Sequence, residues 1–266
     1  MKDLVLSKDE IERHQKKIVE AIRDFVFEAE AKGAVFGLSG GIDSALVGAL
    51  ARRALGNRVL ALIMPEAGVS NEEDVEHAVT FAKEKEIQYR IIELNETLDS
   101  VRRAYPDLLH KKRGFLARAN LAPRARMLFN YAVSNMEGRI VLGTGNKTEL
   151  LLGYFTKYGD GGVDFLPIGD LYKTQVRQLA SYLGLPQHII EKPPSAGLWR
   201  GQTDEGELGE SYENIDKILF LLHDKGYSIE KIASVLKLDR RVIEKISVRM
   251  EKNMHKRTSP QIVRLS

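Results

Sequence analysis

The residues best suited to chemistry form a glycine-rich segment, Ser39-Gly40-Gly41-Ile42-Asp43-Ser44, between a strand-like and a helix-like run. Two adjacent glycines let backbone amides approach an anion without a side chain in the way, and the serine hydroxyls can donate further hydrogen bonds. The segment is not a Walker loop, because no Lys-Ser/Thr pair follows its glycines; Asp43 occupies the turn instead. An acidic group beside phosphates is best explained as a magnesium ligand. The alternative is an ordinary strand-to-helix turn with Asp43 or Ser44 as its N-cap.

The elements that must position this segment alternate between strands and helices. Apolar runs predict strands at 34–38, 59–64, 88–94 and 139–142, and helical periodicity predicts helices at 7–31, 44–55, 70–86, 95–105 and 123–136. Gly33 is expected to stop the first helix, Gly56 to close the second, and Ser70-Asn71-Glu72-Glu73 to form a capping box for the third. After Asp170 the pattern is mainly helical, with helices expected at 172–183, 212–223, 228–236 and 239–250.

This alternation indicates the α/β class: a doubly wound, Rossmann-like parallel sheet with helices on both faces, followed by a helical C-terminal part. Ligands of such sheets bind beyond the carboxyl ends of the strands. The loops after Leu38 and Leu142 are therefore the expected place for a site.

The amino-acid composition excludes several classes of site and partner. The 266 residues contain no cysteine, which excludes a disulfide framework, zinc-thiolate and iron–sulfur sites, and any cysteine nucleophile. The net charge of +3 is too small to make nucleic acid or an anionic membrane the default partner. The N-terminal residues lack the apolar stretch of a signal peptide, and no long apolar run follows, so we expect a cytoplasmic protein.

Later motifs add a family resemblance. The glycine-rich segment resembles the pyrophosphate-binding loop of the N-type ATP pyrophosphatases, which cleave ATP between the α- and β-phosphates. Together with motifs in the same order further on, it makes the chain similar to the ammonia-dependent NAD synthetases from Phe36 to the C-terminal tail. These motifs are Arg124-Ala125-Arg126-Met127, Gly143-Thr144-Gly145-Asn146-Lys147-Thr148-Glu149, the run from Gly153 to Asp164, Leu171-Tyr172-Lys173-Thr174, Pro193-Pro194-Ser195-Ala196-Gly197-Leu198, Gly201-Gln202-Thr203-Asp204-Glu205 and His255-Lys256-Arg257.

The resemblance implies a ligase that forms a C–N bond in the last step of NAD biosynthesis. Such an enzyme amidates deamido-NAD (nicotinic acid adenine dinucleotide) with free ammonia through an NAD-adenylate, uses ATP with Mg2+, and releases AMP and pyrophosphate. It implies an adenine nucleotide alpha hydrolase type of fold in a single domain over 1–266, with the ATP-pyrophosphatase core at about 30–190 and the helical part at about 211–266. It also implies a homodimer with the dinucleotide site at its interface. The larger NAD synthetases carry a glutaminase domain with a cysteine nucleophile, which we do not expect here.

The family pattern also implies roles for individual residues. Asp43 and Glu149 would hold magnesium, and Asp164 would orient or deprotonate the ammonium nucleophile or simply bind substrate. Lys173 would act in catalysis and bind phosphate, and Tyr158 to Gly162 would form a mobile flap. The ATP site would comprise Gly37, Leu38, Ser39, Gly40, Gly41, Ile42, Asp43, Ser44, Thr144, Lys173 and Ser195, and the deamido-NAD site Arg124, Lys157, Asp164, His255 and Lys256.

Several of these roles have a plainer alternative. Glu149 alone is explained by the helix dipole, which favours an acidic first-turn residue by under about 1 kcal/mol. Lys173 alone is explained as a solvated surface charge. Without the family pattern, His255-Lys256-Arg257 would indicate a frayed basic terminus or a weak nucleic-acid patch. The flap would be a simple loop.

Other functions remain as alternatives. A synthetase that aminates xanthosine monophosphate shares the loop but lacks the Tyr158-to-Gly162 and His255-Lys256 motifs, and thiolating enzymes usually need cysteine. A non-catalytic nucleotide sensor would bind ATP and produce no AMP. An RNA-binding tail would show binding that weakens steeply with salt.

Overall fold

The computed structural model describes residues 4–199 and 201–265 and has a four-stranded parallel sheet at its centre. The strands are β1 (Gly33–Gly37), β2 (Val59–Ile63), β3 (Gln88–Ile91) and β4 (Arg139–Val141), in the order β3-β2-β1-β4. Ala34 pairs with Val59 on one side of β1 and with Ile140 on the other. Because the first strand in sequence lies in the middle, the chain winds outward in both directions, as a doubly wound sheet requires.

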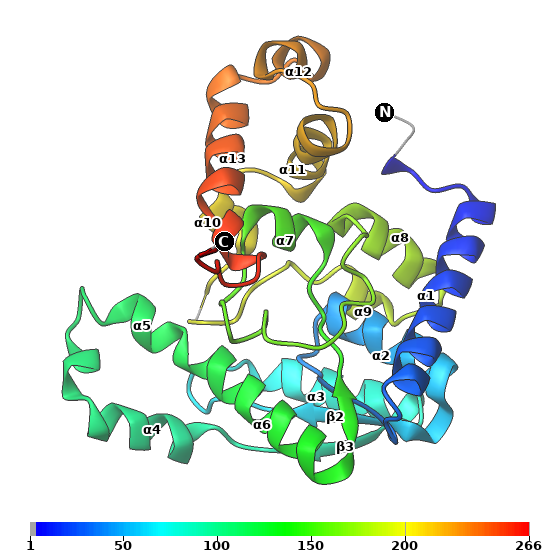
Figure 1. Cartoon of the computed structure of the whole chain (residues 1–266), viewed down its shortest axis with the longest axis vertical. Helices are drawn as coiled ribbons and strands as arrows, with labels where there is room; N and C mark the ends of the chain where they lie inside the picture. Colours follow the sequence, from blue (N-terminus) through cyan, green and yellow to red (C-terminus); the bar gives the residue numbers. More distant parts are fainter. Residues whose placement is uncertain (1–3, 200, 266) are drawn as a thin grey trace.

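Helices cover both faces of this sheet (Figure 1). Alternate side chains of the central strands point to opposite faces, so Phe36 packs in one core and Val35 in the other. The Phe36 face is covered by α1 (Lys8–Glu28), α2 (Ile42–Leu55), α3 (Glu72–Glu84), α8 (Lys173–Tyr182) and α9 (Gln187–Ile190). The Val35 face is covered by α4 (Asn95–Ala104) and α6 (Leu121–Glu137). The predicted α/β fold is confirmed.

A third apolar core lies in the C-terminal part of the chain, at the top of Figure 1. It joins Leu151 and Leu152 to buried side chains of the late helices, such as Tyr212 and Ile243. The helices in and around it are α7 (Lys147–Leu152), α10 (Asp204–Leu208), α11 (Tyr212–Leu219) continued by a π-helical turn (Phe220–Asp224), α12 (Ile229–Leu236) and α13 (Arg240–Lys252). In the ranges that the structure describes, no helix is long and apolar enough to span a bilayer.

Short elements connect these parts. They are α5 (Phe115–Ala119) and the 3-10 turns Gly56–Arg58, Pro106–Leu109 and Met254–Lys256. The sequence reasoning missed α5, α7, α9 and α10, which have four to six residues each. Helices this short span too few turns to show the apolar periodicity from which a helix is predicted.

Several expected boundaries were wrong. The capping box at 70–73 does not form: Asn71 is the N-cap of α3 and accepts from Glu73 N, whereas Ser70 Oγ accepts from Glu66 N. The strand expected at 88–94 ends at Ile91, which pairs with Ile63, the last residue of the neighbouring strand β2. Gly56 closes α2, as predicted.

Gly33 has a different role from the one expected. The first helix ends at Glu28, and Gly33 is the first residue of β1. A Cβ atom on Gly33 would lie 2.0 Å from the carbonyl oxygen of Arg58. The glycine is therefore required by the close approach of two backbone segments and not by helix termination.

We predict that Gly33→Ala destabilises the protein by about 2 kcal/mol or more, because backbone atoms must move to admit the methyl group. Gly184→Ala is the matched control: Gly184 has a φ of 65°, and nothing lies within 4 Å of the place that a Cβ would take, so it should lose only about 1 kcal/mol. Urea unfolding of the two variants beside the unchanged protein measures this. Equal losses in both variants would contradict the prediction.

Candidate active site

The glycine-rich segment forms the turn between β1 and α2 and is held by its own serines. Ser44 Oγ donates to Gly41 O (3.0 Å) and accepts from Ser39 N (3.2 Å), and the two serine hydroxyls lie 3.1 Å apart. Gly40 has a φ of 79°, and a Cβ there would be 2.3 Å from Asp74 O. The N-cap of α2 is Gly41, which makes no side-chain capping bond. Because neither Asp43 nor Ser44 is the N-cap, the plain capping explanation for the segment does not hold.

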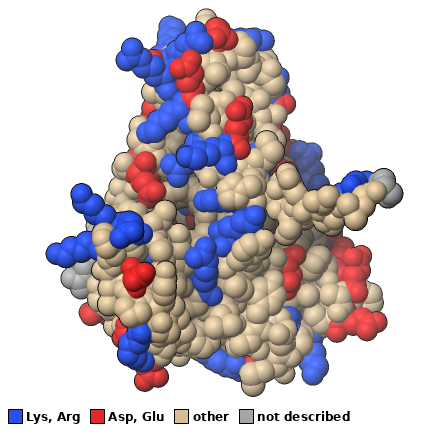
Figure 2. All heavy atoms as spheres, turned by 60° about the vertical axis from the view of Figure 1, so that its left-hand side comes forward, with Lys and Arg blue, Asp and Glu red and all other residues tan. Residues whose placement is uncertain are grey.

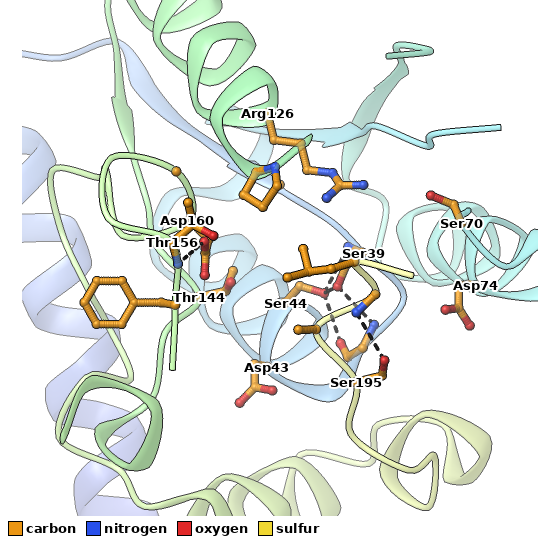
Figure 3. A pocket seen from close by; sticks show the side chains of 18 of the residues that line it. Ser39, Asp43, Ser44, Ser70, Asp74, Arg126, Thr144, Thr156, Asp160 and Ser195 are labelled. Atoms are coloured by element: carbon orange, nitrogen blue, oxygen red, sulfur yellow. Dashed lines mark hydrogen bonds between the residues drawn. The ribbon is translucent and has the colours of Figure 1, made fainter. Parts of the chain in front are cut away.

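The turn opens into one large cavity of about 1390 Å³ (Figure 3). Its walls come from the carboxyl ends of β1 and β2, from α6, and from the segments around residues 64–76, 153–160, 192–199 and 201–204. The predicted ATP-site and metal-site residues that line it are Gly37, Leu38, Ser39, Gly41, Ile42, Asp43, Ser44, Thr144, Glu149, Lys173 and Ser195. Of the predicted set, only Gly40 is not part of the lining.

A buried charge cluster stands at the floor of this cavity. The Lys173 ammonium group, whose side chain is only 3% exposed, contacts Asp43 Oδ2 and lies 3.7 Å from Glu149 Oε1. Asp43 also accepts from Asn146 Nδ2 (2.9 Å). Asn146 caps α7 in a reciprocal capping box, in which its backbone amide donates to the Glu149 carboxylate (3.2 Å), so this one residue contacts the carboxylates of both Asp43 and Glu149. Lys173 is thus a buried counter-ion and not a solvated surface charge.

Burial and the charges of the cluster shift the pKa values of two of its own members. Burial raises the pKa of Glu149 to about 8, and the Asp43 charge adds to this effect while Lys173 opposes it. Burial alone would lower the pKa of Lys173, but the two carboxylates outweigh it and raise that pKa. The two acids repel each other and share one lysine, which makes the site favourable for an additional cation.

The carboxylate pair fits Mg2+. Hard oxygen ligands suit this ion, which usually keeps several waters and takes one or two protein carboxylates together with substrate phosphates. Within residues 4–199 and 201–265, no group of three or more acidic or histidine side chains is placed to hold a metal ion alone. Asp43 and Glu149 would therefore need ATP phosphates and water to complete the coordination.

A second layer of buried acids supports the cluster. Asp216, fully buried, accepts from Thr148 Oγ1 (2.5 Å) and from the Thr174 amide (2.8 Å) and so ties α7 and α8 to α11. Asp204 accepts from the Tyr212 hydroxyl (2.8 Å). Burial raises the pKa of both carboxyls. The sequence reasoning assigned no role to either residue, although Asp204 lies in a motif that it had noted.

The cavity mouth is bordered by the segment that carries Ser195. Ser195 is exposed, and its Oγ accepts from Gly197 N (3.1 Å). The neighbouring Lys192 forms an ion pair with Asp74 of α3, whose backbone lies against Gly40, and this pair holds the segment beside the glycine-rich turn.

The residues expected to bind deamido-NAD are more scattered. Only Lys256 lines the cavity, and its Nζ donates to Gly153 O (2.7 Å) and Phe155 O (3.0 Å). Lys157 donates to the carbonyl of His255 (2.7 Å), and Asp164 accepts from the Tyr131 hydroxyl (2.8 Å) and the Val141 amide (2.8 Å). The members of the set that do not line the cavity are Arg124, Lys157, Asp164 and His255.

Two other charged residues face the cavity in their place, Arg126 and Asp160 (Figure 3). Arg126 donates from Nε to Met64 O (3.1 Å), and Asp160 accepts from Thr156 N (2.9 Å). The surrounding protein raises the pKa of Asp160 by desolvation. Helical spacing could have identified Arg126, because the cavity side of α6 carries residues 123, 126, 127 and 130, whereas 124 points elsewhere.

The segment from Tyr158 to Gly162 is a compact turn against α6. Gly159 N donates to Thr156 O (2.9 Å), and a Cβ on Gly159 would be 2.9 Å from Pro123 Cβ. A Cβ on Gly161 would be 2.5 Å from the Phe155 ring. The glycines are needed for this packing, and the motion of the segment as a flap stays a prediction.

Comparison with known proteins gives a consistent result. Residues 14–260 match the family described as NAD synthase. The chain is 51% identical over 260 residues to a protein of Archaeoglobus fulgidus named NH(3)-dependent NAD(+) synthetase, covering 94% of this chain and 97% of that one. Among solved structures, it is similar to an NMN synthetase from Francisella tularensis (TM-score 0.82, 33% identity, 95% and 98% covered). It is also similar to an NH3-dependent NAD synthetase from Campylobacter jejuni in complex with nitrate (TM-score 0.79, 35% identity, 96% and 99% covered).

We predict that, without added metal, Glu149 makes the protein less stable as the pH rises from about 4.5 to 8. The folded-state pKa lies above the ordinary value of 4.5, so the folded protein binds the extra proton in this window. The stability present at low pH is therefore lost as the pH rises. Urea unfolding in EDTA at pH 5.5 and 8 should show a smaller difference for Glu149→Gln than for the unchanged protein. The exposed control Glu28→Gln should keep the original difference, and a Glu149→Gln variant that does so too would contradict the prediction.

Proposed function

Because the chain belongs to the NAD synthase family, and is thereby a C–N bond-forming ligase of the ammonia-dependent NAD synthetase type, we propose that it converts deamido-NAD to NAD with ATP and free ammonia. The observation that carries the proposal is the buried lysine with two carboxylates directly beside a glycine-rich, anion-binding turn. This arrangement can bind the phosphates of ATP and counter the charge that develops on departing pyrophosphate.

The chemistry requires activation of a carboxylate. The oxygen of a carboxylate is a poor leaving group, so the nicotinate carboxylate attacks the α-phosphorus of ATP, and the bond from that phosphorus to the β-phosphate oxygen breaks. The products are an NAD-adenylate and pyrophosphate. The amides and hydroxyls of Ser39 to Ser44 would surround the β- and γ-phosphates, and Lys173 would contact them from the cavity floor. Bound Mg2+, held by Asp43 and Glu149, would supply further neutralisation of that charge.

Amide formation completes the reaction. Ammonia attacks the acyl carbon of the adenylate, the bond to the AMP oxygen breaks, and one proton must leave the nitrogen. Of the two candidate acids, Asp160 lines the cavity, whereas Asp164 does not line it and accepts from Tyr131 and Val141. These observations favour Asp160 over Asp164 for this step. Positioning and charge stabilisation account for the rest, without a covalent enzyme intermediate.

The second substrate, deamido-NAD, is negatively charged and needs cationic partners. Figure 2 shows Lys and Arg side chains gathered across the middle of one face, which suits the negative charges of a dinucleotide and its nicotinate group. Arg124 and Leu128 lie one turn apart on the exposed side of α6, and Leu128 is 57% exposed. The exposed side of α6, with a cation and a large apolar residue, supports a homodimer in which a second copy helps to complete the dinucleotide site.

A second candidate substrate is the nicotinate mononucleotide. It is favoured by the similarity to a structure named NMN synthetase, whose product is a mononucleotide. The same activation and amidation would then act on a shorter ligand, and the two possibilities differ only in which substrate is used.

We predict that one incubation of the protein with deamido-NAD, magnesium-ATP and ammonium yields NAD and AMP in equal amounts. A parallel incubation with nicotinate mononucleotide should be much slower, and glutamine in place of ammonium should give no NAD. Chromatography of the nucleotides measures all products. ADP in place of AMP, or AMP release that does not depend on deamido-NAD, would refute the proposal, and faster use of the mononucleotide would assign the second substrate.

We predict that Asp43→Ala and Glu149→Ala each lower kcat by at least about a hundredfold, since each removes a ligand for the ion and a partner of Lys173. Far-ultraviolet circular dichroism should show that both variants retain the fold. Magnesium-dependent turnover near the original rate in either variant would refute the metal assignment.

A further inference from the structure

The helix that carries Glu149 is unusually dependent on contacts at its end. Helix α7 has six residues, and its last carbonyl groups have no partner within the helix. A helix of this length has little stability of its own, because each turn must be held by tertiary contacts. The partners of these carbonyls therefore bear on the position of Glu149.

Side chains from the distant segment 253–257 supply these partners. Arg257 donates to Leu151 O (2.8 Å) and also to Met250 O (3.2 Å). Asn253 Nδ2 donates to Leu152 O (2.9 Å). The donors come from more than a hundred positions later in the chain and include a cation, which is the favourable charge at the C-terminus of a helix.

Lys256 continues the same pattern past the end of the helix. Its ammonium group donates to the carbonyls of Gly153 and Phe155. Gly153 has a φ of 60°, and a Cβ there would lie 2.3 Å from Asn253 Cβ. The two segments are thus in direct contact, with Asn253, Lys256 and Arg257 forming what we call the C-terminal clamp (Figure 1 shows the C-terminal turn beside α7).

The other end of α7 is joined to the catalytic cluster. Asn146 caps the helix and donates to Asp43, and the carbonyl of Glu149 accepts from Tyr154 N (2.9 Å) in the last turn. Less than two turns therefore separate the clamp from the Glu149 side chain. No flexible segment lies between the clamp and this carboxylate, so a displacement of the clamp also displaces Glu149.

We propose that the C-terminal clamp positions Glu149 for catalysis through α7, with Arg257 and Asn253 as positioning residues. The proposal rests on the proposed function, in which Glu149 holds the ion that accompanies ATP. Lys256 takes part as well, but it is also a candidate dinucleotide ligand, and Asn253 lines the cavity beside it, so Arg257, which does not line the cavity, provides the cleaner test.

The test compares Arg257→Ala and Asn253→Ala with Arg257→Lys, which keeps a cationic donor, and with Arg264→Ala, a change in the exposed tail. In the Arg257→Ala protein we expect kcat to fall about tenfold and the half-saturating Mg2+ concentration to rise about tenfold, with the KM for deamido-NAD within about twofold. Asn253→Ala should show the same pattern to a smaller extent, Arg257→Lys should recover part of the loss, and Arg264→Ala should match the unchanged protein.

A second measurement is independent of turnover. Amide hydrogen exchange in 150–154 should accelerate in Arg257→Ala and Asn253→Ala and remain unchanged in Arg264→Ala. Unaltered exchange there, or faster exchange with normal kcat and Mg2+ dependence, would overturn the proposal. So would a lower melting temperature with unchanged Mg2+ dependence, or a rise confined to the KM for deamido-NAD. If the unchanged protein makes no NAD, the proposed function fails, while exchange and calorimetric Mg-ATP binding still decide whether the clamp acts on this site.

Discussion

The architecture around the cavity depends on the burial of one positive charge. The Lys173 ammonium group is almost completely removed from solvent, a state that is unfavourable unless acidic partners are held close to it. Its partners Asp43 and Glu149 come from helices that follow different strands of the sheet, and Lys173 itself begins a third helix. Each helix must therefore start at a defined place for the three groups to meet. Asp216 and Asn146 then join these helix starts by hydrogen bonds. Polar contacts, and not apolar packing alone, therefore hold the charged residues of the site in position.

Much of the central fold could be predicted because its signals are local. The apolar runs of β1 and β2 have buried side chains on both faces, and α2 and α6 are long enough to show their periodicity. β3 was expected to extend to Leu94. It ends at Ile91 because an edge strand is limited by its neighbour, and β2 ends at the residue paired with Ile91. The constraint on Gly33 depends on a backbone carbonyl 25 positions away, which no local pattern records.

The same distinction between local signals and contacts between distant segments applies to the candidate site. The glycine-rich turn could be predicted from its own residues, whereas Glu149 and Lys173 came from the family resemblance and only the structure shows that they meet. Arg126 and Asp160 were missed because other charged residues lie close to each of them in the sequence. They differ from those neighbours only in facing the cavity, and this depends on the orientation of α6 and of the turn beside it. Four residues expected to bind deamido-NAD lie outside the cavity lining, and two of them, Lys157 and Asp164, are held by hydrogen bonds within the chain, which no motif records.

The contact between α7 and the segment at 253–257 has a consequence for the order in which the protein is made. A ribosome produces this segment 101 to 106 positions after the carbonyls that it will bind. The four strands and the glycine-rich turn are synthesised before this segment, so they can assemble while α7 still lacks its distant partners. Bringing together segments so far apart in sequence is also a slow step of folding. A nascent chain should therefore acquire its nucleotide-binding turn early and its complete set of ordered carboxylates last, which separates the capacity to bind ATP from the capacity to consume it.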